Sequence, residues 1–217
     1  MSIIKKQITI PKTARYFQLG EITEQTSHVI IACHGYAQMA NYFLKWFEPF
    51  NLKNTVIIAP EGLSRFYWNG FSGKVVASWM TKEDREEDIK DYINYLDEAV
   101  IQLNLKPSTK ISALGFSQGG ATAARWVAQS KFEFENLILW AAVFPEDIQI
   151  ETIGSKVQSS LEILFGDNDQ FYDLNQVNLI KETLINSNIK LNFDIFKGEH
   201  RIYPEPLNNL FKKLNLS

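Results

Sequence analysis

Apolar runs of strand length alternate along this chain with longer segments of helical period. Strands are predicted for the apolar runs at residues 28–34, 55–60, 110–116, 136–144, 161–166 and 189–198. Helices are predicted between and after them at residues 38–49, 82–104, 118–130, 173–186 and 204–214. This alternation is typical of βαβ units, so we expect an α/β fold with helices on both faces of a mostly parallel sheet.

Other segments complete the expected domain. The stretches "IIKKQITI" and "RYFQLG" near the start predict an antiparallel hairpin at one edge of the sheet. The 217 residues contain no repeat and no linker rich in Pro, Gly or Ser, so we expect one domain over residues 1–217. Residues 61–80 are too irregular for a strand or a helix and are predicted as a long loop.

That loop is rich in aromatic residues, and two readings of it are compatible. Its rings anchor the loop to the core, or they form one wall of an apolar substrate pocket. On the second reading we expect Phe66, Trp68 and Trp79 to line the pocket.

Composition excludes several classes of function. The formal net charge is -3, and residues of both signs are interspersed along the chain. Because nucleic-acid binding favours a basic patch, we expect no nucleic-acid partner. No apolar run approaches the roughly 18 residues that span a bilayer, and the first residues contain no signal peptide. A single cysteine, Cys33, cannot form an internal disulfide and is predicted as a small buried core residue. Together these features favour a cytoplasmic protein.

A serine stands between two glycines at one predicted strand-to-helix junction, in "SALGFSQGGATAARW" (residues 112–126). The pattern G-x-S-x-G in this context is typical of the nucleophile elbow of α/β-hydrolases. A tight turn brings backbone close to the positions two residues before and after Ser117, so both positions favour glycine. The alternative is a glycine-rich turn with an inert exposed serine. We predict that Ser117 is the nucleophile.

A serine hydroxyl needs a base within hydrogen-bonding reach. The chain has three histidines, His28, His34 and His200, and only His200 follows Ser117. Because this fold supplies its triad in the order serine, acid, histidine, His200 is the predicted base.

The acid is expected after the strand that precedes His200. Two carboxylates stand there, in "LEILFGDNDQFYD", at Asp167 and Asp169. One should accept the hydrogen bond from the imidazole, and the other should brace the loop. Spacing alone does not choose between them.

An earlier strand end, "ACHGYAQMANYF", is expected to complete an oxyanion hole. Gln118, which follows the nucleophile, supplies one backbone N–H, and Tyr36 or Ala37 supplies the other after the turn at Gly35. His34 is expected to brace this loop.

The four blocks "CHGYAQ", "GFSQGGATA", "FGDNDQF" and "GEH" resemble the phospholipase/carboxylesterase family of serine hydrolases, which includes the acyl-protein thioesterases. The resemblance implies a single-domain α/β-hydrolase fold without a large cap. It also implies a triad of Ser117, Asp169 and His200, with oxyanion donors at Tyr36 and Gln118. The aromatic stretch at 61–80 differs from the usual family sequence, which favours a bacterial esterase subgroup over a protein deacylase.

We therefore expect a serine carboxylesterase that cleaves small ester or thioester substrates through an acyl-enzyme, without metal or cofactor. One alternative is a serine peptidase on the same fold. Another is a binding protein that keeps a hydrolase scaffold without turnover. The sequence predicts neither the acyl chain nor the oligomeric state.

Overall fold

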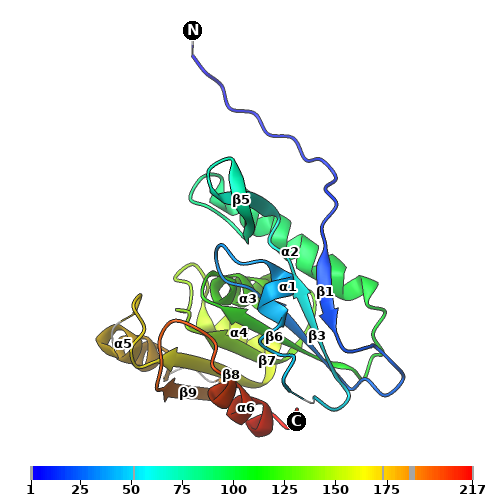
Figure 1. Ribbon diagram of the computed structural model, residues 1–217, viewed down its shortest axis with the longest axis vertical. Helices are drawn as coiled ribbons and strands as arrows, with labels where there is room; N and C mark the ends of the chain where they lie inside the picture. Colours follow the sequence, from blue (N-terminus) through cyan, green and yellow to red (C-terminus); the bar gives the residue numbers. More distant parts are fainter. Residues whose placement is uncertain (1, 51, 173, 186–188, 217) are drawn as a thin grey trace.

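One mostly parallel sheet forms the centre of the molecule (Figure 1). The computed structural model describes residues 2–50, 52–172, 174–185 and 189–216. The sheet strands in this part of the chain are β1 (Tyr16–Leu19), β2 (His28–Cys33), β3 (Thr55–Pro60), β6 (Lys110–Phe116), β7 (Phe134–Trp140), β8 (Val157–Gly166) and β9 (Leu191–Phe196). Their spatial order is β1-β3-β2-β6-β7-β8-β9, and only β1 runs antiparallel to its neighbour.

Helices cover both faces of the sheet, as predicted. They are α1 (Ala40–Leu44), α2 (Arg85–Gln102), α3 (Gln118–Gln129), α4 (Ile150–Lys156), α5 (Leu174–Ile185) and α6 (Pro204–Lys213). Helices α2 to α5 share one core cluster with residues such as Ile31, while α1 and α6 share the other with residues such as Ile30. Because successive strand residues face opposite layers, every residue of β2 is buried. The expected α/β architecture is confirmed.

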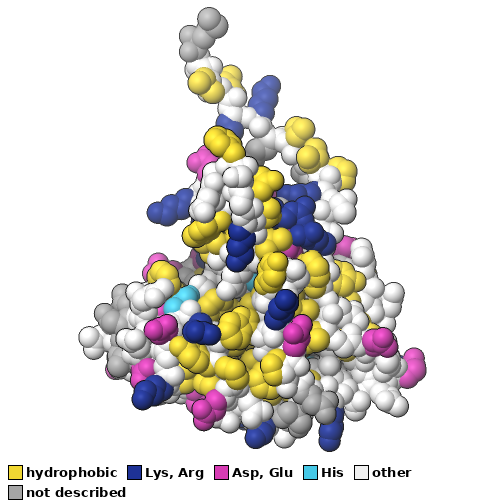
Figure 2. Space-filling model, in the orientation of Figure 1, with side chains coloured by type: hydrophobic (Ala, Val, Ile, Leu, Met, Phe, Trp, Pro, Cys, Tyr) yellow, Lys and Arg dark blue, Asp and Glu magenta, His cyan; other side chains and the backbone are white. Residues whose placement is uncertain are grey.

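The prediction of an irregular loop at residues 61–80 is wrong. This segment contains an antiparallel hairpin of β4 (Ser64–Asn69) and β5 (Ser72–Ser78), which projects from the body of the molecule (Figure 1). The two turn residues are Gly70 and Phe71, and Gly70 has a φ of 70°, a conformation that glycine adopts without strain. The hairpin exposes Trp68 and Phe71, and Figure 2 shows apolar side chains gathered over it and over the extended N-terminal segment.

The prediction of an N-terminal hairpin is also wrong. Residues 2–15 contain no strand, and β1 pairs with β3 instead. The predicted helix at 173–186 has both of its end residues outside the described residues, whereas α5 lies within that range.

The connection from β7 to β8 contains only the short helix α4, so no large cap is inserted there. In the part of the chain that the structure describes, no helix combines the length and apolar character needed to cross a bilayer.

A row of polar side chains interrupts one buried face near the amino ends of the strands. Ser112 on β6 lies 2.8 Å from His28 Nε2, Asn136 donates to Ser112 Oγ, and Ser160 donates to Asn136. The Ser112 hydroxyl is thus hydrogen-bonded to both the His28 ring and the Asn136 amide. Burial lowers the pKa of His28 to about 4, against opposing attraction from Glu135.

This histidine makes a testable contribution to stability. Between pH 6.5 and 4 the unfolded chain binds a proton at residue 28 that the folded chain does not, so stability falls as the pH falls. The full effect is on the order of 3 kcal/mol at 1.4 kcal/mol per unit. Urea unfolding across this window should therefore show a shallower pH slope for His28→Gln than for the unmodified chain. An identical slope in both proteins would contradict this assignment. Buried His34 titrates in the same direction, so part of the slope remains.

Candidate active site

Ser117 occupies the one-residue corner between β6 and α3. Its φ of 53° and ψ of -120° lie outside the regions that non-glycine residues favour, and its N–H is held by the Trp140 carbonyl at 2.9 Å. A β-carbon on Gly115 would lie 2.1 Å from the Gly119 carbonyl oxygen, and one on Gly119 would lie 2.2 Å from that of Cys33. The glycines therefore permit the close approach that aims the serine hydroxyl off the sheet edge.

The structure brings His200 and Asp169 to this serine. His200 Nε2 lies 2.9 Å from Ser117 Oγ, and His200 Nδ1 lies 2.7 Å from Asp169 Oδ2. The side chain of Asp169 is fully buried and that of His200 is 9% exposed. A carboxylate only accepts hydrogen bonds, so in the neutral ring Nδ1 carries the proton and Nε2 accepts from the serine hydroxyl.

The two aspartates that spacing left equivalent have different contacts. Asp169 contacts His200, and its second oxygen accepts the Phe171 N–H at 2.8 Å. Asp167 instead accepts the Gly198 N–H at 2.9 Å, which ties the acid loop to the histidine loop. Geometry thus favours Asp169 as the partner of the imidazole and Asp167 as the brace.

Three aromatic rings surround the imidazole, and the sequence analysis missed them. The ring centroids of Phe116, Phe171 and Tyr172 lie 5.1, 4.6 and 6.2 Å from that of His200. Phe171 is exposed and so forms part of the surface beside the triad. The signal was present, since "QFYD" directly follows Asp169.

The backbone N–H groups expected to bind the oxyanion belong to α3 and to the loop after β2. Gln118 is the first residue of α3, where an N–H has no acceptor within the helix. The N–H of Ala37 is already bound to the Ala77 carbonyl at 2.9 Å, whereas that of Tyr36 has no partner within the described residues. The sequence did not choose between Tyr36 and Ala37 as the second donor. Of these two, only the Tyr36 N–H is free of a hydrogen-bond partner among the described residues.

Trp79 does not line an open pocket, which corrects the expectation from the sequence. It is 1% exposed and belongs to the core. Its indole N–H donates to the His34 carbonyl at 2.8 Å, and its backbone N–H donates to the Gln118 side chain at 3.2 Å. The residue therefore links His34, which precedes the Tyr36 loop, to Gln118 at the start of α3.

Phe66 and Trp68 lie differently, on β4 of the projecting hairpin. Their rings lie 5.8 and 6.4 Å from the ring of Tyr36, centroid to centroid. The half-exposed rings of Tyr36 and Trp68 thus form an aromatic surface next to the oxyanion loop. Lys74, on the second strand of the hairpin, lies over the ring of Tyr42.

A second serine–histidine pair, Ser112 and His28, is no rival site. Ser112 is fully buried, so no substrate carbonyl can approach its hydroxyl. The pair lies near the amino ends of β2 and β6, whereas Ser117 follows the carboxyl end of β6. No group of three or more His, Cys, Asp or Glu within the described ranges is arranged to hold a metal ion.

Comparison with known proteins points to one family. The family model described as Phospholipase/Carboxylesterase matches residues 16–217. No curated protein sequence matches the chain significantly.

Solved structures match almost the whole chain at low identity. Acyl-protein thioesterase 2 of Zea mays has a TM-score of 0.72 at 18% identity, over 94% of this chain and 98% of that one. The carboxylesterase of Bacillus cereus has a TM-score of 0.67 at 15% identity, over 93% of each chain. A phospholipase/carboxylesterase of Dyadobacter fermentans has a TM-score of 0.65 at 14% identity, over 94% of this chain and 97% of that one. At such identities the likeness shows the fold.

The close approach at the serine corner can be tested with alanine. Gly119→Ala should destabilise the chain by at least about 3 kcal/mol, because its new methyl group meets backbone at 2.2 Å. Gly154→Ala is the matched control: nothing lies within 4 Å of its β-carbon position on helix α4, so a gain of up to about 1 kcal/mol is expected. Thermal and urea unfolding measure both. Equal stability of the two variants would contradict the packing described here.

Proposed function

This chain belongs to the phospholipase/carboxylesterase family and has the α/β-hydrolase fold, and on that premise we propose that it is a serine carboxylesterase. It cleaves carboxylic ester or thioester bonds through a covalent acyl-enzyme on Ser117. The observation that carries this proposal is the 2.9 Å distance from Ser117 Oγ to His200 Nε2, with Asp169 on the other ring nitrogen.

In the acylation step, His200 removes the hydroxyl proton as Ser117 Oγ attacks the substrate carbonyl carbon. Asp169 accepts the Nδ1–H bond, which keeps the ring in the right tautomer and stabilises the imidazolium. The carbonyl oxygen becomes an anion between the N–H groups of Tyr36 and Gln118. Each such donor contributes about 3–4 kcal/mol to transition-state stabilisation.

Collapse of the tetrahedral intermediate expels the alcohol or thiol, which takes its proton from His200. Water then enters and its oxygen attacks the acyl carbon while His200 removes one of its protons. His200 returns that proton to Ser117 Oγ as the bond to Oγ breaks and the carboxylic acid leaves. Both half-reactions use the same base and the same oxyanion donors.

Aromatic side chains on two sides of the site support a small ester with an apolar part as the substrate. Phe171 lies beside the imidazole, and Phe66 and Trp68 extend from the oxyanion loop through Tyr36. We propose that the apolar part of the substrate contacts these rings, because flat aromatic surfaces bury apolar groups well. A panel of p-nitrophenyl esters from acetyl to palmitoyl, with thioester counterparts, measures the preferred acyl length.

Ser117→Ala should lower kcat for p-nitrophenyl acetate by about 10⁴-fold or more and remove labelling by a fluorophosphonate. The control is Ser112→Ala, which removes the other histidine-bonded serine and should retain labelling. Loss of labelling in the Ser112 variant alone would overturn the proposal.

The two aspartates provide a second test. Asp169→Asn should lower kcat by roughly 10³- to 10⁴-fold, because an amide in place of the carboxylate favours the wrong imidazole tautomer. Asp167→Asn should lower it by less than tenfold, since Asp167 bonds only the backbone of the histidine loop. Steady-state kinetics compare the variants, and a larger loss at residue 167 would reverse the two roles.

A further inference from the structure

His34 lies directly before the oxyanion loop and uses both of its ring nitrogens. It is fully buried at the carboxyl end of β2. Its Nδ1 lies 2.8 Å from the Gly35 carbonyl oxygen, and its Nε2 lies 3.0 Å from the backbone nitrogen of Gly62. The triad does not use this histidine.

The two contacts define a single tautomer. A carbonyl oxygen can only accept, so Nδ1 of His34 carries the proton, and a backbone N–H can only donate, so Nε2 is unprotonated. A doubly protonated ring would direct Nε2–H at the Gly62 N–H. Burial lowers the pKa of His34 despite the opposing effects of the hydrogen bond to Gly35 and the charge of Glu61, which is consistent with a neutral ring.

The carbonyl that His34 holds belongs to the same peptide unit as the Tyr36 N–H. A trans peptide is planar, and its C=O and N–H point in opposite directions. Fixing the Gly35 oxygen on one side therefore fixes the direction of the Tyr36 hydrogen on the other. The Gln38 N–H also reaches this oxygen, at a longer 3.3 Å.

We propose that His34 is a positioning residue that aims the Tyr36 N–H at the oxyanion, through the bond from its Nδ1–H to the Gly35 carbonyl. This inference rests on the proposed esterase function and adds a residue to it. The Nε2 contact with Gly62 selects the tautomer that makes the bond to Gly35 available.

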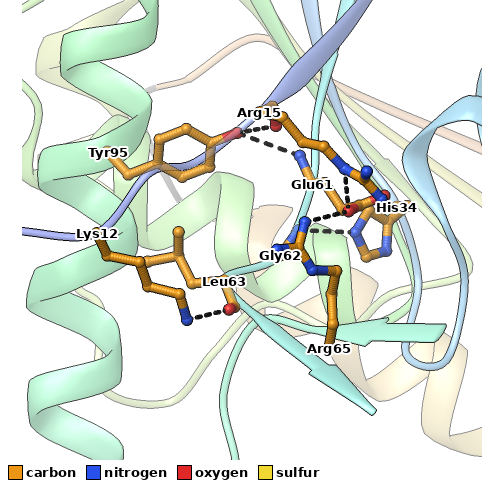
Figure 3. Close-up of polar contacts among 8 residues, drawn as sticks. All are labelled: Lys12, Arg15, His34, Glu61, Gly62, Leu63, Arg65 and Tyr95. Atoms are coloured by element: carbon orange, nitrogen blue, oxygen red, sulfur yellow. Dashed lines mark hydrogen bonds and ion pairs between the residues drawn. The ribbon is translucent and has the colours of Figure 1, made fainter. Parts of the chain in front are cut away.

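An ion-pair cluster around the buried Glu61 carboxylate lies next to Gly62 (Figure 3). The Glu61 carboxylate, 1% exposed, binds Arg15 at 2.7 Å and Arg65 at 3.4 Å. The Glu61 N–H donates to the Arg15 carbonyl, and the Tyr95 hydroxyl bonds the same carbonyl. A β-carbon on Gly62 would lie 2.5 Å from the Ser78 carbonyl oxygen, so this backbone is packed tightly against the end of the hairpin.

Two substitutions separate the contacts of His34. Asparagine places its amide nitrogen near the position of Nδ1 and can donate to the Gly35 carbonyl. Glutamine reaches the position of Nε2 and can accept from Gly62 but cannot make the Gly35 bond. A purely structural role predicts similar losses in both variants.

His34→Gln should lower kcat for p-nitrophenyl acetate at least tenfold with little change in KM, because an oxyanion donor acts in the transition state. Affinity for a boronic acid that mimics the tetrahedral intermediate should fall in parallel. His34→Asn should recover most of kcat. The matched control is His28→Gln, which removes a buried, hydrogen-bonded histidine from the other end of β2 and should leave kcat within about threefold.

The tautomer gives a readout that needs no variant. Nitrogen-15 NMR of the unmodified chain, which has three histidines, should show His34 protonated at Nδ1 and not at Nε2. An Nε2–H tautomer, equal losses in the Asn and Gln variants, or full kcat in the Gln variant would each overturn the positioning role. If the unmodified chain hydrolyses no ester and is not labelled at Ser117, the proposed function fails and the positioning role fails with it.

Discussion

The close approach of helix α3 to the carboxyl end of β2 determines the geometry of the site. Gly119 lies against the Cys33 carbonyl and Gly115 lies against Gly119, so the helix begins almost on top of two neighbouring strands. This approach puts the first N–H of α3 beside the loop that carries Tyr36, and it forces Ser117 into a backbone conformation that few residues adopt. The surrounding sheet maintains that conformation by holding the Ser117 N–H on the Trp140 carbonyl.

The sequence predicted the architecture well because its signals are local and strong. Buried parallel strands are continuous apolar runs, and five of those predicted were located to within a few residues. The glycine spacing around Ser117 and the single histidine after it were enough to nominate residues that fold into contact. The choice between Asp167 and Asp169 needed the path of the loop, since both follow the same strand.

The sequence analysis failed where tertiary contacts decide the outcome. The hairpin of β4 and β5 carries aromatic residues on both faces, so its strands lack the usual alternation, although Gly70, the first turn residue, was a usable turn signal. In the sequence, Trp79 cannot be distinguished from the exposed aromatic residues Trp68 and Phe71 of the same segment. Only the fold shows that it is buried against His34. The different contacts of His28 and His34 also emerge only from the fold. His28 joins the polar row near the amino ends of the strands, and His34 bonds the backbone of Gly35 and Gly62.

The tip of the hairpin of β4 and β5 tolerates amino-acid substitution better than the backbone around Ser117 does. Trp68 and Phe71 are 55% and 100% exposed, whereas a β-carbon at Gly115 or Gly119 would meet backbone closer than 2.5 Å. Substitutions can therefore change the aromatic surface of the hairpin without disturbing the backbone around Ser117. Tolerance of substitution and the need for an unchanged backbone therefore lie in separate parts of one small scaffold.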